Sequence, residues 1–417
     1  MSVFPSFTYR NDELCIESVS LNLIAQEYGT PCYVYSQSAI TTAYQEFNAA
    51  FAEQDHLICY AVKANSNIAI LNLLARLGSG FDIVSGGELQ RVIKASGDPQ
   101  KTVFSGVGKQ IEEMREALAA DILCFNVESE AELMILNQLA GRMGKIAPVS
   151  LRVNPDVDAK THPYISTGLK ENKFGVPVGE AERIYKSRQQ FPHIRFTGLD
   201  CHIGSQLTEL APFTQASEKM LHLLDRLEKQ GLQIEHLDLG GGLGIRYAEE
   251  TPPSIKAYVS ALCTSTHQRK KRILIEPGRS LVGNSGLLLT QVMYLKHTPD
   301  RNFAIVDAAM NDLLRPALYN AYHEILPVVT NSKATKNYQV VGPICETGDF
   351  LGHDRKLSLS NGDLLAVMST GAYGMSMSSN YNTRPRAAEV MVNGNSINLI
   401  RKRESIDQLM ATEYILP

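Results

Sequence analysis

Three short motifs contain residues that could together hold a phosphorylated cofactor. Lys63 follows an apolar run in YAVKAN, so its amine lies where a predicted strand ends rather than on a solvated helix face. A second run leads into LDLGGGLG, where the missing side chains of Gly240, Gly241 and Gly242 let backbone N–H groups approach an anion closely. A third run leads into EPGR, residues 276–279. A rim lysine facing water and an ordinary tight turn are the plain alternatives for the first two motifs.

An amine, an anion cradle and a carboxylate are the groups that pyridoxal 5′-phosphate requires of a protein. Lys63 would bind the cofactor aldehyde as a Schiff base, and the glycine segment would hold the phosphate. Glu276 would keep the pyridine nitrogen protonated, although a structural salt bridge at a strand end is its other interpretation. The spacing of GGGLG matches neither the dinucleotide fingerprint nor a Walker loop, which disfavours both of those sites.

The elements that must position these motifs follow a strand and helix rhythm. Segments of helical period separate eight short apolar runs, and this alternation over about 220 residues predicts a (β/α)8 TIM barrel. Barrel enzymes build their sites at the C-terminal ends of the strands, and the loops after strands seven and eight commonly hold a phosphate. The eight predicted strands cover residues 57–61, 81–84, 103–105, 123–127, 149–153, 196–202, 236–239 and 273–275.

After residue 283 the helical alternation stops, which predicts a mainly β C-terminal domain. The strand-like segments 7–10 and 14–17 precede the barrel, and we expect them to pair with the C-terminal sheet. The expected domains are therefore 1–34, 35–283 and 284–417. The predicted C-terminal strands cover residues 287–295, 303–306, 339–341, 364–369 and 389–392.

The composition narrows the classes of partner. Lys and Arg number 40 against 44 Asp and Glu, and a net charge of -4 argues against a nucleic-acid or anionic-membrane footprint. No segment approaches the roughly 20 apolar residues that span a bilayer, and the first ten residues lack a signal-peptide pattern, so we expect a cytoplasmic location. The seven cysteines are scattered without a CxxC pair, which suggests neither a disulfide framework nor a zinc ribbon.

Taken in order, the motifs resemble those of fold-type III pyridoxal phosphate enzymes, and within them the diaminopimelate decarboxylase family. The resemblance covers essentially the whole chain, with one conservative departure at Thr347, where serine is more usual. It implies decarboxylation of meso-2,6-diaminopimelate to L-lysine and CO2, the last step of lysine biosynthesis by that pathway. The motifs are YAVKAN at 60–65, FDIVSGGEL at 81–89, HIGSQ at 202–206, LDLGGGLGI at 237–245, EPGR at 276–279, DAAMNDLLRPALY at 307–319, CETGD at 345–349 and GAYG at 371–374.

The resemblance also implies roles for individual residues. His202 would stack on the cofactor ring, Asp82 would belong to the cofactor site behind the residues that contact the cofactor, and Cys345 would protonate the substrate carbon after CO2 leaves. The phosphate would be surrounded by Ser205, Gly240, Gly241, Gly242, Gly278 and Arg279. The substrate would be bound through its distal carboxylate by Arg279, Arg315 and Tyr319, through its distal ammonium by Glu346, and near the cofactor by Tyr373.

In relatives the CETGD-type loop reaches the site of the neighbouring subunit, so the resemblance implies a homodimer with shared active sites. The polar segment 154–175 is expected to close over the substrate. Asp156 and Asp158 resemble a metal-binding pair, but without supporting ligands they are interpreted as a plain loop, and no metal is expected.

Three alternatives remain at this point. Decarboxylation of ornithine, arginine, lysine or carboxynorspermidine would leave Arg315 without a distal carboxylate to bind. Racemisation would be expected to place an arginine, not Glu276, against the pyridine nitrogen. A carrier module for pyridoxal phosphate would consist of the barrel alone. Without the resemblance, His202 would be interpreted as a structural histidine, and Arg315 and Glu346 would be interpreted as partners in surface salt bridges.

Overall fold

The chain folds into two compact units. The computed structural model describes residues 6–158, 173–266, 269, 271–332 and 334–417. Ala43–Ile245 and Thr251–Ser280 form the barrel unit, and Met1–Thr42, Arg246–Glu250 and Leu281–Pro417 form the β unit. The domain boundaries expected after residues 34 and 283 remain predictions.

Eight parallel strands close the barrel unit into a ring, which confirms the predicted barrel. Each strand pairs with its neighbour in the ring, and β13 pairs with β5 to complete it. The short β10 (Val176–Pro177) extends β9 outside the ring. The ring strands are β5 (His56–Ala61), β6 (Gly80–Ile83), β7 (Thr102–Phe104), β8 (Cys124–Val127), β9 (Ala147–Asn154), β11 (Ile194–Asp200), β12 (His236–Asp238) and β13 (Arg272–Ile275).

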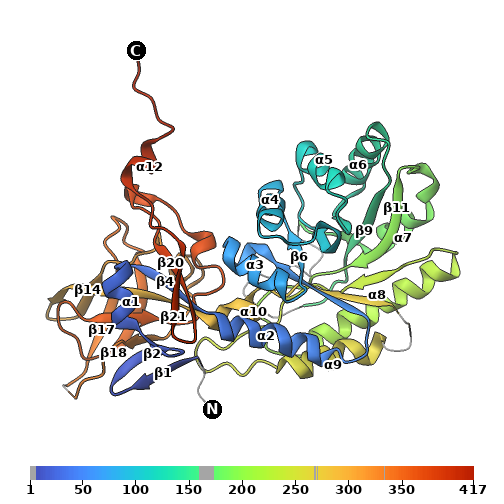
Figure 1. Cartoon of the computed structure of the whole chain (residues 1–417). Helices are drawn as coiled ribbons and strands as arrows, with labels where there is room; N and C mark the ends of the chain where they lie inside the picture. The colour runs from blue at the N-terminus through green and yellow to red at the C-terminus, as the bar shows by residue number, and fades with distance from the viewer. Residues whose placement is uncertain (1–5, 159–172, 267–268, 270, 333) are drawn as a thin grey trace. The chain divides into compact units, whose positions relative to one another are not determined.

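Helices follow most of the strands, and most consecutive helices pack side by side around the outside of the barrel (Figure 1). Serine residues start two of them, because the Oγ of Ser85 and that of Ser129 each accept a bond from a backbone N–H in the first helical turn, at 3.2 Å. The helices are α2 (Gln37–Ala50), α3 (Ile68–Arg76), α4 (Gly86–Lys94), α5 (Ile111–Ala119), α6 (Glu130–Arg142), α7 (Val178–Lys186), α8 (Ala211–Lys229) and α9 (Ile255–Thr266).

The interior of the barrel is apolar near one end of the strands and polar near the other. An apolar cluster fills it toward the strand N-termini and includes Leu57, Val103 and Leu274. Buried polar and charged residues gather toward the strand C-termini, among them Asp200 and Asp238, which are the last residues of β11 and β12. These buried polar groups indicate a chemical site at that second end, as in other barrels.

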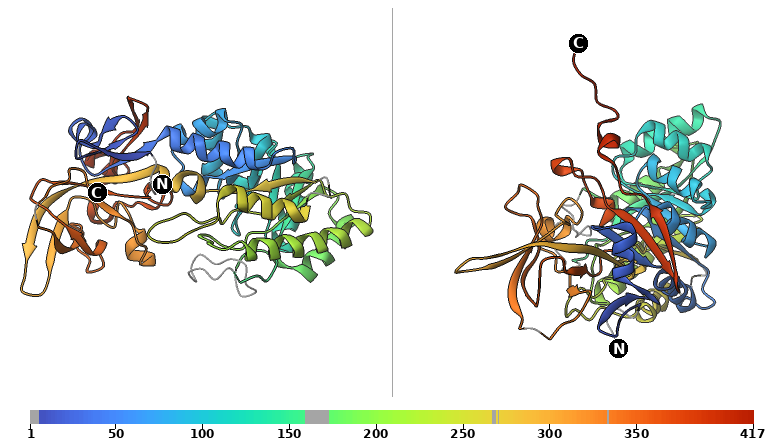
Figure 2. Two further views of the ribbon diagram at one scale, coloured as in Figure 1. Left: turned by 90° about the horizontal axis from the view of Figure 1, so that it is seen from below. Right: turned by 60° about the vertical axis from the view of Figure 1, so that its left-hand side comes forward.

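The β unit is built on a nine-stranded mixed sheet, which confirms the predicted β domain (Figure 2). Its path runs β18-β17-β15-β14-β4-β20-β21, with β19 and β16 branching from β14. The unit also carries α1 (Leu21–Tyr28), α11 (Arg315–Tyr319) and α12 (Ile406–Met410), while α10 (Arg279–Val282) begins in the barrel unit and ends in the β unit. The strands are β4 (Cys32–Ser36), β14 (Gly286–His297), β15 (Asn302–Val306), β16 (Ile325–Pro327), β17 (Lys336–Val341), β18 (Phe350–Leu357), β19 (Leu364–Val367), β20 (Ala388–Asn393) and β21 (Ser396–Arg401).

The N-terminal strands belong to the β unit, as predicted. β1 (Phe7–Arg10), β2 (Glu13–Ile16) and β3 (Val19–Ser20) form a three-stranded sheet, and an antiparallel bridge between Glu13 and Val329 links this sheet to the C-terminal part of the chain. They pack against the large sheet through apolar side chains, because Phe7, Leu14 and Ile16 share a buried cluster with Leu287 and Val390. The segment that pairs within the large sheet is β4, antiparallel to β14 and parallel to β20.

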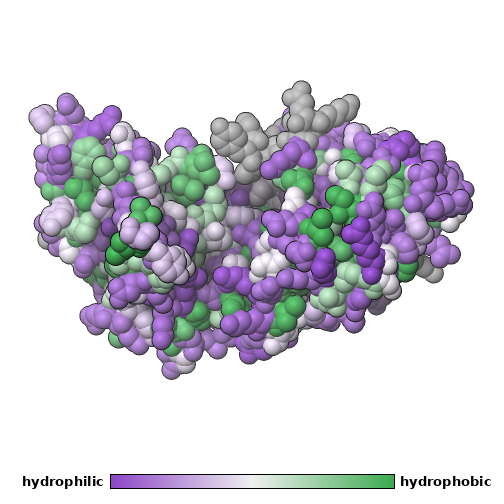
Figure 3. All heavy atoms as spheres, turned by 90° about the horizontal axis from the view of Figure 1, so that it is seen from above, coloured by the Kyte–Doolittle hydropathy of each residue, from purple (hydrophilic) through white to green (hydrophobic). Residues whose placement is uncertain are grey.

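Two structural features agree with the mixed polar and apolar composition of the chain. On the face drawn in Figure 3, hydrophobic residues lie in small patches among hydrophilic ones. Among the described residues, no helix is both long and apolar enough to cross a membrane. Most of the loop predicted to close over the substrate, at 154–175, lies outside the described residues.

Candidate active site

Lys63 lies at the mouth of the barrel, in a short 3-10 turn (Val62–Ala64) directly after β5. Its Nζ donates a hydrogen bond to Oδ2 of Asp82 on β6, which forms an ion pair. The Asp82 side chain is fully buried, whereas that of Lys63 is 37% exposed. The amine is thus held by a buried anion and stays accessible from the barrel mouth.

The glycine loop after β12 packs against the ends of both neighbouring strands. A Cβ on Gly241 would lie 2.2 Å from the backbone oxygen of Glu276, and one on Gly240 would lie 2.5 Å from that of Cys201. Gly240 also has a φ of +66°, which side chains rarely adopt. No side chain fits between this loop and the neighbouring backbone, so positions 240 and 241 require glycine.

His202 and Ser205 follow β11, beside the glycine loop. The backbone N–H of Gly241 donates to Nδ1 of His202 at 3.1 Å, so this nitrogen is unprotonated and the ring is neutral. Burial and the positive charges of Arg152 and Lys63 lower the pKa of His202 well below its usual value. Nη2 of the buried Arg279 donates to Oγ of Ser205 at 3.1 Å. A cation, a hydroxyl and a side-chain-free loop therefore border one surface, a combination suited to a phosphate.

Glu276 follows β13 and is buried, with 6% of its surface exposed. Its Oε1 accepts long hydrogen bonds from Oγ of Ser105 and Nδ2 of Asn126, both at 3.3 Å. Burial raises the pKa of Glu276 well above its usual value, and the nearby carboxylates Asp238, Asp82 and Asp200 raise it further.

The sequence prediction missed four charged residues at the same end of the barrel, which are Asp200, Asp238, Arg152 and Glu128. Asp200, Asp238 and Glu276 each place a carboxylate oxygen within 4.8 Å of the other two, a group that could also ligate a cation. The buried Arg152 of β9 pairs with Glu128 at 3.0 Å. Charged residues inside otherwise apolar strands were the signal that could have identified them.

The β unit contains the predicted substrate residues. Arg315 begins α11 and is buried, and its Nη1 contacts Nε2 of His323 at 2.9 Å. Its guanidinium lies 4.6 Å from the centre of the Tyr247 ring, within the range of a cation–π interaction. Tyr319 ends the same helix and is half-buried. The sequence prediction missed both His323 and Tyr247, which fix the orientation of the arginine.

Cys345 and Glu346 lie side by side in an exposed loop of the β unit. The backbone N–H of Cys345 donates to Oδ1 of Asn382 at 2.9 Å, and the Tyr381 hydroxyl donates to Oε2 of Glu346 at 3.4 Å. The buried Asp349 closes the loop by accepting bonds from the N–H groups of Ile344 and Met310 at 2.9 and 2.7 Å. Tyr373 is half-buried and has a φ of +56°, a strained conformation for a tyrosine.

The predicted residues thus fall into two sets. The barrel set gathers at the C-terminal ends of β5, β6, β11, β12 and β13, and contains Lys63, Asp82, His202, Ser205, Gly240, Gly241, Gly242, Glu276, Gly278 and Arg279. The β-unit set contains Arg315, Tyr319, Cys345, Glu346 and Tyr373. Asp156, of the proposed plain loop, donates its backbone N–H to Oδ1 of Asn154 at 2.9 Å, as in a turn.

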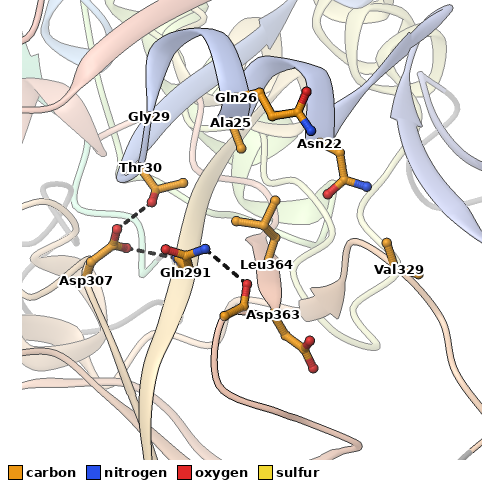
Figure 4. Close-up of a pocket in the computed structure, with 11 residues that line it drawn as sticks. Asn22, Ala25, Gln26, Gly29, Thr30, Gln291, Asp307, Val329, Asp363 and Leu364 are labelled. Carbon is orange, nitrogen blue, oxygen red and sulfur yellow. Dashed lines mark hydrogen bonds between the residues drawn. The ribbon is translucent and has the colours of Figure 1, made fainter.

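A separate cavity of about 640 Å³ lies in the β unit between α1 and β14 (Figure 4). Its carboxylate Asp307 accepts bonds from Thr30 and Thr290 hydroxyls and from the Gln291 N–H, at 2.5 to 2.9 Å. Both carboxylate oxygens accept hydrogen bonds from the protein. Because Thr30 follows α1 and the other two donors lie on β14, Asp307 links the end of α1 to the sheet.

The barrel set fits pyridoxal phosphate, because it supplies an amine, a glycine loop bordered by Arg279 and Ser205, and a buried carboxylate. Residues 37–283 match the family model described as "Pyridoxal-dependent decarboxylase, pyridoxal binding domain". The chain is 57% identical over 412 residues to diaminopimelate decarboxylase of Pseudomonas aeruginosa, with 99% of each chain covered. The chain belongs to the diaminopimelate decarboxylase family.

Solved structures of the diaminopimelate decarboxylase family share the fold. The Helicobacter pylori enzyme complexed with L-lysine has a TM-score of 0.91 at 43% identity, covering 94% of this chain and 98% of that one. The M. jannaschii enzyme in co-complex with L-lysine has a TM-score of 0.95 at 38% identity, covering 100% and 99%. These matches confirm the family and the fold that the motifs indicated, and pyridoxal phosphate is the cofactor of this family of decarboxylases.

Proposed function

We propose that this chain is a carboxy-lyase that converts meso-2,6-diaminopimelate to L-lysine and CO2 with pyridoxal phosphate. The observation that carries the proposal is its 57% identity to a diaminopimelate decarboxylase over 99% of both chains. The reaction completes lysine biosynthesis by the diaminopimelate pathway. A cytoplasmic location is part of the proposal.

In the barrel unit, we assign each residue a role in holding the cofactor. Pyridoxal phosphate supplies an aldehyde that binds amines and a ring that withdraws electrons from the substrate carbon as CO2 leaves. Lys63 would be the attachment point, with Asp82 holding its amine, and Glu276 would keep the pyridine nitrogen protonated. His202 would lie against the ring as a neutral imidazole. The phosphate would be bound by Ser205, Gly240, Gly241, Gly242, Gly278 and Arg279.

In the β unit, Arg315 and Glu346 distinguish the substrate. The Arg315 guanidinium is held from one side by His323 and stacked on Tyr247, so its donor fork is already oriented for a carboxylate. Glu346 is steadied by Tyr381 and offers a negative charge for the distal ammonium. Arg279, Tyr319 and Tyr373 complete the substrate set. Only a substrate with both a carboxylate and an ammonium at its far end satisfies all of these groups.

The exposed CETGD loop supports a homodimer in which each site uses both chains. Cys345 and Glu346 are exposed in the single chain, although the proposal gives both of them chemical roles. Cys345 would deliver a proton to the substrate carbon after decarboxylation. A partner subunit that takes up this loop would exclude water from the thiol and the carboxylate.

The reaction is tested with purified enzyme, pyridoxal phosphate and meso-2,6-diaminopimelate, scoring both lysine and CO2. We expect equal amounts of the two products. L-Lysine and L-ornithine serve as competing substrates, and we expect CO2 release from them to be slower. Faster release from either one would overturn the substrate assignment and leave only the decarboxylase class.

Arg315→Lys provides the matched variant for the substrate set, because it keeps the charge and removes the fork. We expect KM for meso-2,6-diaminopimelate to rise by about 10- to 100-fold, the effect of losing a hydrogen bond to a charged group. The absorption of the bound cofactor should be unchanged. An unchanged KM would remove Arg315 from the substrate set.

A further inference from the structure

Arg315 packs with two side chains of the β unit that the motifs did not assign to the site. Arg315 is 6% exposed, and its Nη1 lies 2.9 Å from Nε2 of His323, which is 0% exposed. The Tyr247 ring lies under the guanidinium and meets the His323 ring edge to face, with the ring centres 5.2 Å apart and the planes at 79°. The three side chains therefore form one buried group.

The hydrogen bonds of His323 define where its proton lies. Nδ1 is 2.8 Å from the backbone oxygen of Met368, and because a carbonyl oxygen accepts, Nδ1 must carry the proton. The guanidinium of Arg315 has donors and no acceptor, so Nε2 must offer its lone pair. The two bonds together require the neutral Nδ1–H tautomer.

Backbone hydrogen bonds hold this imidazole on the large sheet. Met368 directly follows β19, and His323 lies just before β16, which pairs antiparallel with β19. The N–H of Met368 donates to the oxygen of Glu324 at 2.8 Å, and Nη2 of Arg355 on β18 donates to the oxygen of His323 at 3.0 Å. His323 is thus a fixed acceptor, built on strands rather than on a loop.

A fixed acceptor orients the arginine before a ligand arrives. The Tyr247 ring limits the tilt of the guanidinium, and the bond to His323 limits its rotation. A carboxylate binds a guanidinium through two parallel bonds in the guanidinium plane, so the direction of that plane decides how well the carboxylate is held. Orientation in advance raises affinity, because less freedom is lost on binding.

We propose that His323 is the positioning residue behind the selectivity for a distal carboxylate: in its neutral Nδ1–H form it holds the Arg315 guanidinium through Nε2. In this role His323 acts through the arginine rather than on the substrate. The inference rests on the proposed function and deepens it, because it assigns the discrimination between a carboxylate-bearing ligand and a plain diamine to a pair of residues.

Two ligands that differ by one carboxylate test this role. Decarboxylation removes one of the two carboxylates of meso-2,6-diaminopimelate, so L-lysine keeps the distal one, whereas 1,5-diaminopentane has none. Calorimetric titration of the holoenzyme with each ligand measures affinity without turnover. His323→Asn keeps a donor for Met368 and loses the acceptor for Arg315, whereas His323→Gln carries an amide oxygen that reaches as far as Nε2.

We expect His323→Asn to weaken L-lysine binding by about tenfold, the effect of losing a hydrogen bond to a charged group, and 1,5-diaminopentane binding by less than about threefold. His323→Gln should bind both ligands within about threefold of wild type, because the acceptor is restored. Equal weakening of both ligands in His323→Asn would make His323 a structural residue and overturn the proposal. Wild-type affinity for L-lysine in His323→Asn would also overturn it.

A double-mutant cycle tests whether His323 acts through the arginine. In an Arg315→Ala background, His323→Asn should cause no further loss of L-lysine affinity, because no guanidinium is left to hold. A second loss of about tenfold would show that His323 acts independently of Arg315 and would contradict the proposal.

The tautomer is measured in the wild-type protein, so this test does not depend on the folding of a variant. Nitrogen-15 NMR of histidine-labelled holoenzyme distinguishes a protonated ring nitrogen from one with a lone pair, and the His323 signals are those missing from His323→Gln. We expect a protonated Nδ1 and an unprotonated Nε2. The opposite tautomer, or a ring protonated at both nitrogens, would rule out the proposed role.

These outcomes separate the inference from the proposed function. If wild type decarboxylates meso-2,6-diaminopimelate but His323→Asn weakens L-lysine and 1,5-diaminopentane equally, only the inference fails. If wild type releases no lysine and CO2 from meso-2,6-diaminopimelate, the proposed function fails, whatever the tautomer of His323.

Discussion

Lys63 forms an ion pair with Asp82. Substitutions of Lys63 should therefore affect both the covalent link to the cofactor and the unfolding temperature. Replacing it with alanine should abolish both the visible absorption of the bound cofactor and any link reducible by borohydride, because no other amine is assigned to the aldehyde. Lys63→Arg should lose the same link while keeping a cation beside the buried carboxylate of Asp82. We therefore expect a higher unfolding temperature for Lys63→Arg than for Lys63→Ala. A borohydride-reducible link in Lys63→Ala would remove Lys63 as the attachment point.

At the scale of elements, the backbones of the loops after β12 and β13 approach each other closely. Gly241→Ala would bring a Cβ to within 2.2 Å of the Glu276 oxygen, so the two loops must separate. Overpacking of this kind costs about 1–3 kcal/mol, which predicts pyridoxal phosphate binding weaker by about tenfold or more. Gly179→Ala is the control, because nothing lies within 4 Å of its added Cβ. Equal affinity in the two variants would show that the loops do not form the cofactor cradle.

The start of β12 should make the barrel sensitive to acid. Burial lowers the pKa of His236 to about 4, and a Cβ on Gly198 of β11 would lie 2.1 Å from its ring, so the ring is packed tightly. The unfolded chain binds this proton near pH 6.5, so the stability contributed by the neutral ring is complete above that pH and declines as the pH falls toward 4.

Relative to His236→Gln, wild type should therefore lose about 2 kcal/mol of unfolding free energy between about pH 7.5 and pH 5. Urea unfolding of both proteins at the two pH values measures this difference. Parallel losses in the two proteins would assign the acid sensitivity to other groups.

At the scale of the whole molecule, active sites shared between subunits predict that two inactive variants regain activity when they form mixed dimers. Mixing Lys63→Ala with Cys345→Ala should recover about a quarter of wild-type activity after subunit exchange, because half of the dimers are mixed and each has one intact site. Lys63→Ala mixed with Glu276→Gln is the control. Both of its lesions lie in the barrel unit, so no intact site can form. Absence of recovery in the first mixture, with exchange demonstrated, would mean that each chain completes its own site.

Much of the fold could be predicted from local patterns of apolar and polar residues. The eight barrel strands alternate with helical segments, and each apolar run ends at a polar or glycine residue that marks the barrel mouth, as at Lys63 and Gly240. The segment Cys32–Ser36 was missed as a sheet strand because its partners lie more than 250 residues away, in β14 and β20. Pairing over such distances leaves no local pattern, whereas β1 and β2 were predicted from their own sequence pattern and lie in the β unit as expected.

By itself, the sequence determined the order of the motifs and hence the family, the barrel and the residues that present chemistry at its mouth. Only the tertiary structure decided what surrounds those residues. It brings Asp200 and Asp238 to Glu276 and places His323 and Tyr247 on Arg315. The physical reason is that motif residues are read from short neighbouring stretches, while the charge of a buried carboxylate is set by groups from other strands that only folding brings within a few ångströms.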